Sequence, residues 1–222
     1  MQALQANMGT AHTTTRPATT LVELVDGVVL PGSVMRFDRN EEIFAEEDEA
    51  DFVYQVVAGA VREIRILGDG RRQVSAFHLP GEVFGLECGE THLGFAEAVV
   101  DSRVALVRRS ELDLAVEADG AAARKLWNYT ARDMLRLQDH LLLLGRKSAV
   151  ERVVTFLLRL SSRSGTGASI DLPMSRSDIA DYLGLTIETV SRTFSQLERD
   201  GAISIPSARH IVLHNRLALR CD

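Results

Sequence analysis

The sequence has 222 residues, of which 45% are hydrophobic and 25% are charged. This composition is that of an ordinary folded protein, and it excludes the disordered, fibrous and disulfide-rich classes. The formal charge of −6 is spread unevenly: residues 1–145 carry 14 Lys and Arg against 23 Asp and Glu, whereas residues 146–222 carry 11 against 8. The C-terminal third is therefore mildly electropositive, which is the sign that a phosphate backbone attracts.

Residues 1–20 are rich in Thr and Ala and contain no basic segment followed by an apolar one. We therefore expect a disordered tail and not a secretory signal. The chain has no run of about 18 apolar residues, so no transmembrane helix is expected. Cys88 and Cys221 are its two cysteines, too few for a disulfide framework, and this favours a reducing cytoplasm.

Residues 21–118 are expected to form an antiparallel β-roll that is closed by a short helix. Short β-rich runs alternate with Gly and Pro turns up to about residue 107, and the sequence GDG at residues 68–70 marks one hairpin. Regular short strands of this kind favour a barrel or roll. The residues that follow, up to 118, have a helical pattern.

Residues 119–145 are expected to form one long helix with an apolar stripe. The stripe consists of Trp127, Thr130, Met134, Leu137, Leu141 and Leu144, at alternating spacings of three and four. Such a stripe is too apolar for a free surface and suits a partner helix in a two-stranded seam. The alternative is that this helix packs only against its own domain. We favour a homodimer, because the DNA-binding motif predicted below gains from two-fold symmetry.

Residues 175–201 have the pattern of two short helices joined by a tight turn. Apolar residues at helical spacing form one seam: Ile179, Ala180, Leu183, Leu185, Val190, Phe194 and Leu197. Ser175 and Asp178 have the spacing of a capping box at the start of the first helix. Gly184 suits a left-handed turn between the helices, and Thr186 can cap the second helix.

The exposed N-terminal end of the second helix carries Ile187, Glu188, Ser191 and Arg192. In a helix-turn-helix, this end enters the major groove of DNA. A helix over residues 148–161 precedes the motif. Two short strands, residues 203–205 and 210–214, follow it with a turn at residues 206–209. We therefore expect residues 146–222 to be a winged helix-turn-helix DNA-binding domain in an α+β protein.

Three longer motifs stand out: NEEIFAEEDEADFVYQVVAGAVR at residues 40–62, FHLPGEVFG at residues 77–85 and DIADYLGLTIETVSRTFSQLERDGAI at residues 178–203. Together they resemble the CRP/FNR superfamily of bacterial transcription regulators. The E-x-x-S-R pattern that begins at Glu188 is similar to the FNR and FixK branches, and the missing FNR cysteine cluster favours the FixK type. The resemblance implies a β-roll like a cyclic-nucleotide-binding domain, a dimerisation helix and a winged helix-turn-helix.

The resemblance also implies which residues read DNA. Glu188 would accept a hydrogen bond from a cytosine amino group, Arg192 would donate to guanine O6 and N7, and Ser191 would contact a neighbouring base. The expected phosphate contacts, which position the protein without specifying sequence, are Thr186, Arg176, Ser207 and Arg209. The alternative for Glu188 and Arg192 is an ion pair within the helix, worth only about 0.3–0.5 kcal/mol.

The same resemblance implies a homodimer, mainly an activator, that binds a palindrome of the form TTGAT-N4-ATCAA. Two half-sites one helical turn apart require a two-fold symmetric dimer. RNA polymerase would be contacted through surface loops at residues 161–168 and 68–72. Target genes in low-oxygen or nitrogen-oxide respiration are implied.

The β-roll departs from the superfamily at the ligand site. Cyclic-nucleotide binding uses a carboxylate for the ribose and an Arg-Ser pair for the phosphate. Glu82 stands at the first position, but Gly94 and Phe95 stand where the Arg-Ser pair belongs, so a cyclic phosphate would lack its counter-charge. Four-cysteine iron–sulfur ligation is impossible with two cysteines. We expect no cofactor, and DNA binding without a small ligand.

Other chemistry has little support in the sequence. Cys88 is interpreted as a small, partly buried residue and not as a ligand or redox switch. His210 and His214 lie on a predicted strand, where a spacing of four does not converge on a zinc ion. No nucleophile–base set or phosphate loop is present, so an enzyme is not expected. The rival hypothesis is a sensor whose DNA binding is gated by a gas, haem or small ligand in the β-roll.

Overall fold

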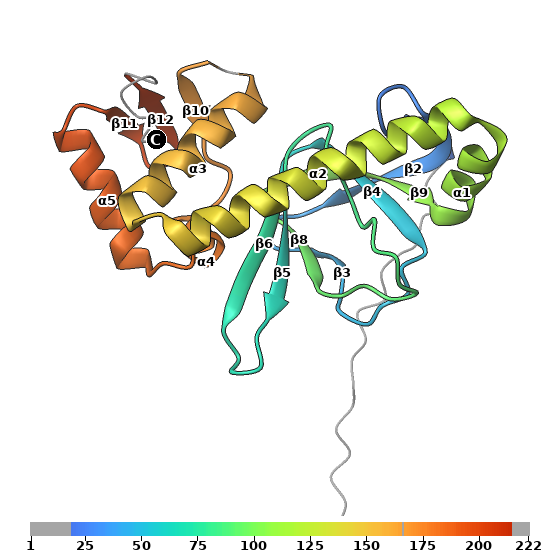
Figure 1. Ribbon diagram of the computed structural model, residues 1–222, viewed down its shortest axis with the longest axis horizontal. Helices are drawn as coiled ribbons and strands as arrows, with labels where there is room; N and C mark the ends of the chain where they lie inside the picture. Colours follow the sequence, from blue (N-terminus) through green and yellow to red (C-terminus); the bar gives the residue numbers. More distant parts are fainter. Residues whose placement is uncertain (1–18, 166, 215–222) are drawn as a thin grey trace, which may run out of the picture.

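The computed structural model describes residues 19–165 and 167–214 (Figure 1). The predicted tail, residues 1–20, lies outside this part of the chain except for its last two residues, and Cys221 lies outside it as well. A β-rich unit occupies one end of the molecule, and helices with a small sheet occupy the other (Figure 1). One long helix connects the two ends.

Antiparallel strands form the β-rich unit: β1 (Thr20–Glu23), β2 (Val29–Phe37), β3 (Glu42–Phe44), β4 (Phe52–Ala58), β5 (Val61–Ile66), β6 (Arg72–His78), β7 (Val83–Phe84), β8 (Phe95–Ala98) and β9 (Ser102–Arg108). They pair into two sheets, ordered β1-β2-β9-β4-β7 and β3-β8-β5-β6. Alternate side chains point into the space between the sheets, and Val56 and Val104 are fully buried there. The predicted antiparallel β-roll is confirmed.

Helix α1 (Arg109–Ala118) closes the roll, and the long helix α2 (Gly120–Arg146) follows it directly. Asp119 separates the two, and its carboxylate caps α2 by accepting from the backbone N–H of Ala121 at 2.8 Å. Tyr129 attaches α2 to the roll, because its hydroxyl accepts from the Val83 N–H at 2.8 Å and donates to the Val83 carbonyl at 2.9 Å. Over residues 19–165 and 167–214, no helix has both the length and the apolar character that a bilayer crossing requires.

Helix α3 (Ala149–Ser164) begins with a capping box between Ser148 and Glu151 and ends at Gly165, whose φ of 67° is left-handed. The helix runs three residues beyond the predicted end at residue 161. Its last turn is held by the β-roll, since the Arg163 guanidinium donates to the carboxylate of Glu82 and to the carbonyl of Phe77. The predicted loop at residues 161–168 was therefore wrong in its first half, which is helical.

The C-terminal elements are β10 (Ser169–Asp171), α4 (Arg176–Leu183), α5 (Ile187–Arg199), β11 (Ile203–Ser207) and β12 (His210–Leu213). Helices α4 and α5 are the predicted helix-turn-helix, and β11 and β12 are the predicted wing. Strand β10 was not predicted, and it pairs with β12 in a sheet ordered β10-β12-β11. Pro206 lies inside β11 and not in the turn, which an edge strand allows because a proline there removes no ladder hydrogen bond.

One hydrophobic core joins the roll to the C-terminal elements. Its members from the roll are Ala60, Ile64, Val74, Phe77, Leu79 and Val99, and they pack with buried residues of α2, α3, α4 and the wing. The rings of Phe77 and Tyr182 lie 5.2 Å apart, and Phe156 of α3 lies beside both. The division into residues 21–118, 119–145 and 146–222 stays a prediction, and this core spans all three segments.

Arg152 connects the ends of two helices to α3. Its guanidinium donates to the carbonyls of Leu144 at 2.7 Å and Lys147 at 2.9 Å, at the end of α2. It also donates to the carbonyl of Leu183, at the end of α4, at 3.0 Å. The last carbonyls of a helix have no partner within the helix, so a cation there satisfies them and complements the helix dipole.

We expect Arg152→Ala to lower the free energy of unfolding by about 1.5–3 kcal/mol, because charged hydrogen bonds to three carbonyls are lost. Urea denaturation at neutral pH measures the change. Arg146→Ala is the matched control, since it removes the same charge from an exposed position in the last turn of α2 and should cost only about 0.3–1 kcal/mol. Equal losses in the two variants would contradict this role of Arg152.

Candidate nucleic-acid interface

The helix-turn-helix has the local geometry that the sequence predicts. The Ser175 hydroxyl accepts from the Asp178 N–H at 3.1 Å, and the Asp178 carboxylate accepts from the Ser175 N–H at 3.0 Å, which completes the capping box. Gly184 has a φ of 61° and ends α4 in the left-handed conformation. Thr186 caps α5 by accepting from the Thr189 N–H at 3.2 Å. All residues of the predicted seam are buried except Leu185, which is partly buried.

The predicted base-reading residues share one exposed face of α5. Ser191 and Arg192 lie three and four residues after Glu188, and all three are exposed, as is Ile187 beside them. Within the part of the chain that the structure describes, the side chains of Glu188 and Arg192 have no hydrogen-bond or ion-pair partner. The alternative, an ion pair between them, is therefore absent. The first two turns of α5 therefore expose one carboxylate acceptor and one guanidinium donor that are available for hydrogen bonds to a ligand.

The predicted phosphate contacts are less uniform. Thr186 and Ser207 are exposed. Arg176 is half-buried, with its guanidinium carbon 3.4 Å from the centre of the Phe194 ring, so it also packs against the core between the two helices. Arg209 is exposed at the wing turn, but it borders a cavity of about 580 Å³ whose other wall includes Leu79 of the β-roll. The structure thus groups Thr186 with the base-reading face and places Arg209 towards the roll.

Helix α2 exposes most of its predicted apolar stripe. Trp127 is 72% exposed and Leu141 is 69% exposed, and Met134 and Leu137 are at least half exposed. The hydroxyl of exposed Thr130 bonds to carbonyls of its own helix. Leu144 differs, because it is partly buried against the core of the same chain. Two further exposed leucines, Leu135 and Leu142, were missed; each directly follows a residue of the stripe and therefore lies about 100° around the helix from it.

The β-roll contains a cavity of about 300 Å³, and Gly94 and Phe95 line it. Its wall carries the carboxylates of Glu63, Glu87 and Asp133, with Arg65 and His78 as the basic residues. A Cβ atom at Gly94 would lie 2.5 Å from the carbonyl oxygen of Ile64, so this position has no room for the arginine of a phosphate site unless strand β5 moves.

The carboxylates of the cavity wall differ in their pKa shifts. Burial by itself raises the pKa of Glu63, but His78, whose Nε2 lies 3.3 Å from the carboxylate, lowers it, and the net direction is down. Glu63 therefore stays ionised at neutral pH. Burial raises the pKa of Asp133. A phosphate group placed in this cavity would meet the negative charge of Glu63.

Glu82, which the sequence resemblance places at the ribose-binding position, bonds to Leu79 and Arg163. Its carboxylate accepts from the Leu79 N–H at 2.9 Å and from Arg163 Nε at 2.9 Å. Burial raises the pKa of Glu82, but the hydrogen bonds and charge of Arg163 outweigh burial and lower it. Glu82 therefore connects the roll to α3, and it does not line the cavity that holds Gly94.

The remaining cysteine and histidine expectations have mixed outcomes. Cys88 is exposed, so the interpretation of a partly buried residue was wrong; it lies in the loop between β7 and β8, away from the packed strands. His210 bonds to Asp171 at 2.7 Å and to Ser169 at 3.0 Å, whereas His214 bonds to Ser204. Over residues 19–165 and 167–214, no three His, Cys, Asp or Glu side chains gather as a metal site would require.

Comparison with known proteins gives a consistent result. The sequence profile of a Crp-like helix-turn-helix domain matches residues 151–221, and that of a cyclic nucleotide-binding domain matches residues 34–119. The chain is 50% identical over 194 residues to the nitrogen fixation regulation protein FixK of Azorhizobium caulinodans, covering 85% of this chain and 78% of that protein. It is 46% identical over 190 residues to the FixK of Rhizobium meliloti, covering 86% and 87%. The solved structure of FixK2 from Bradyrhizobium japonicum superposes with a TM-score of 0.81 at 53% identity, covering 85% of this chain and 95% of that one.

The acidic cavity generates a prediction about ligands. Cyclic AMP should bind with a dissociation constant weaker than about 1 mM, because its phosphate would meet carboxylates where a counter-charge is needed. Isothermal titration calorimetry measures this, with adenosine as the control that lacks the charge. Saturable binding of cyclic AMP at micromolar concentrations would contradict the electrostatic argument.

Proposed function

This chain belongs to the CRP/FNR family of DNA-binding transcription regulators, within its FixK group, and on that premise we propose that it binds a TTGAT-N4-ATCAA-like palindrome as a homodimer and activates transcription there. Glu188, Ser191 and Arg192 read bases, with Glu188 accepting from cytosine and Arg192 donating to guanine. Thr186, Arg176, Ser207 and Arg209 contact phosphates and set the position of the protein on the duplex. No catalytic step is part of this function.

One observation carries the proposal: the side chains of Glu188 and Arg192 are exposed on the same helix face and have no partner among the described residues. An ion pair between them would be worth only about 0.3–0.5 kcal/mol on this exposed helix face, so both charged groups are available to DNA at little cost. In this protein they stay apart and point out of the helix that a helix-turn-helix places in the major groove. Their donor and acceptor chemistry suits adjacent base pairs.

The exposed face of α2 supports the dimer. Trp127, Met134, Leu137 and Leu141 form an apolar surface that monomeric proteins rarely expose as a continuous patch. A second copy of α2 in a two-stranded seam covers it. Two recognition helices then face successive major grooves, as a palindrome with half-sites about one turn apart requires.

We further propose that the protein works in the cytoplasm without cyclic nucleotide or iron–sulfur cluster, in the control of low-oxygen or nitrogen-oxide respiration. RNA polymerase would contact residues 165–168 and the exposed hairpin tip at residues 68–71. Arg72, the last residue of the hairpin contact that the sequence predicts, lies in β6 and is bonded to α4. The rival function is a sensor whose cavity binds an effector that gates DNA binding; the cavity of about 300 Å³ in the roll is the observation that favours it.

Arg192→Ala tests the base-reading assignment. We expect it to cost about 1–3 kcal/mol of binding free energy on the palindrome and to relax the preference at one base pair, since one bidentate contact to guanine is lost. Fluorescence anisotropy with the palindrome and with duplexes changed at single positions measures both effects. Arg199→Ala removes the same charge from the exposed C-terminal end of α5 and should leave the base preference unchanged. A neutral Arg192→Ala would show that the docking geometry is wrong.

Leu137→Glu tests the dimer. A carboxylate in the apolar seam has no partner there, so the variant should sediment as a monomer and lose most of its affinity for the palindrome. Analytical ultracentrifugation gives the oligomeric state. Leu21→Glu, which changes an even more exposed leucine on strand β1, is the control and should remain dimeric. A dimeric Leu137→Glu protein would mean that the subunits meet elsewhere.

A further inference from the structure

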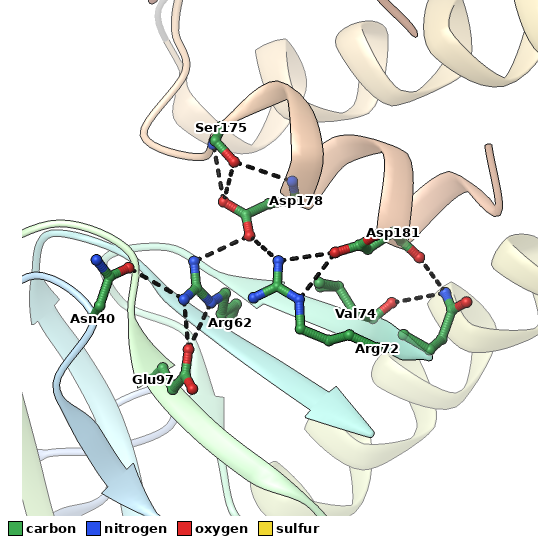
Figure 2. Close-up of polar contacts among 9 residues, drawn as sticks. Asn40, Arg62, Arg72, Val74, Glu97, Ser175, Asp178 and Asp181 are labelled. Carbon is green, nitrogen blue, oxygen red and sulfur yellow. Dashed lines mark hydrogen bonds and ion pairs between the residues drawn. The ribbon is translucent and has the colours of Figure 1, made fainter. Parts of the chain in front are cut away.

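Two arginines of the β-roll bind one carboxylate of the helix-turn-helix (Figure 2). Asp178 Oδ1 accepts from Arg62 Nη1 at 3.0 Å and from Arg72 Nη2 at 2.6 Å. The Asp178 side chain is only 4% exposed and that of Arg62 only 9%. Arg72 also pairs with Asp181 one turn later on α4, at 2.8 Å, and this pair is more open to solvent.

The roll supports these contacts from its own side. Arg62 lies on β5 and also donates to Glu97 Oε2 on β8 and to Asn40 Oδ1, at 2.5 and 3.2 Å, so its guanidinium is fixed from several directions. Gln73, next to Arg72 on β6, donates to the backbone carbonyl of Asp181 at 2.5 Å. Strands β5 and β6 therefore hold α4 with both side-chain and backbone contacts, and Glu97 of β8 orients Arg62.

The carboxylate of Asp178 has two separate uses. Its Oδ2 completes the capping box with Ser175, a contact within the helix-turn-helix. Its Oδ1 is used entirely by the two arginines of the roll, and a capping box does not need that contact. Burial by itself raises the pKa of Asp178, but the hydrogen bonds of Ser175 and the charge of Arg62 lower it, so the carboxylate is ionised at neutral pH. The stability it contributes is present at neutral pH and is lost only as the pH falls through this lowered pKa.

Holding α4 also holds the recognition helix. Ile179, Leu183, Val190 and Phe194 are buried between α4 and α5, so these two helices form one packed unit. An ion pair at the first turns of α4 therefore fixes the direction in which α5 points relative to the roll and α2. Units within one chain ordinarily move relative to each other unless their contact is extensive.

We propose that Arg62 and Arg72 are positioning residues for DNA recognition: through Asp178 and Asp181 they clamp the helix-turn-helix to the β-roll and hold the recognition helix in the orientation that binds DNA. The clamp needs no ligand, because all of its charges belong to the chain. This inference rests on the proposed DNA-binding function. Glu82 and Arg163 add a second attachment, between the roll and α3.

The clamp is tested in the full-length protein with Arg72→Ala. Its matched control is Arg71→Ala, because Arg71 is the neighbouring residue and pairs with Asp69 within the exposed hairpin. Binding is measured with DNA alone, so the proposed contact of this hairpin with RNA polymerase does not enter. Affinity for the palindrome should fall by roughly 5-fold or more in Arg72→Ala, the lower end of usual coupling between sites, and stay unchanged in the control. Arg72→Lys keeps the charge without the forked geometry and should restore part of the affinity. Thermal melting shows that each variant is folded.

A second measurement does not depend on DNA. Spin labels are placed at Cys88, which is exposed on the roll, and at an introduced Ser195→Cys, which is exposed on α5, in a Cys221→Ser background. Labelled chains are diluted with unlabelled ones so that distances within one chain dominate. Pulsed EPR should give a narrow distance distribution in the parent protein and in Arg71→Ala, and a broad one in Arg72→Ala.

The outcomes separate the clamp from the proposed function. A narrow distance distribution in Arg72→Ala would overturn the clamp. A broad distribution with unchanged affinity for the palindrome would also overturn it, because the orientation of the recognition helix would then not matter for DNA binding. If the parent protein does not prefer the palindrome over a scrambled duplex, the proposed function fails. The EPR distances then still decide whether Arg72 holds α4 to the roll.

Discussion

The buried carboxylate of Asp178 is shared by the two halves of the protein. On one side it caps the first helix of the helix-turn-helix, and on the other it binds Arg62 and Arg72 of the roll. Replacing this buried carboxylate removes one partner from each arginine and leaves Arg62 with Glu97 and Arg72 with Asp181, which is more costly than losing an exposed ion pair. The apolar core that includes Phe77 and Phe156 supplies most of the packed surface between the roll and the C-terminal elements. In our proposal the ion pairs then select one orientation of the helix-turn-helix on that surface.

These contacts suggest a role for the β-roll that does not require it to bind a ligand: the roll positions the helix-turn-helix. Glu82, which the sequence resemblance places at the ribose position, binds Arg163 of α3. Gly94 and Phe95, which the same resemblance places at the phosphate position, line a cavity that carries Glu63 and other carboxylates. In our proposal the orientation of the DNA-binding unit does not depend on a ligand in the roll. The roll holds that unit permanently through its own charges.

The sequence predicted what depends on local pattern. The capping box at Ser175, the turn at Gly184 and the alternation of strands are all set by residues within a few positions of each other, and the structure has them. The missed features depend on distant partners. Arg62 and Asp178 are 116 residues apart, so no spacing rule connects them. The last turn of α3 and the burial of Leu144 likewise depend on contacts with other elements.

The most direct test of this account is the affinity of the reduced, ligand-free protein for a TTGAT-N4-ATCAA duplex and for a scrambled duplex, at about 0.15 M salt. If the chain's own ion pairs hold the recognition helix in place, the palindrome should be preferred by a factor of about 10³ or more with nothing added. Binding that stays unselective until small molecules from a cell extract are supplied would contradict the account, because an effector and not the clamp would then set the orientation.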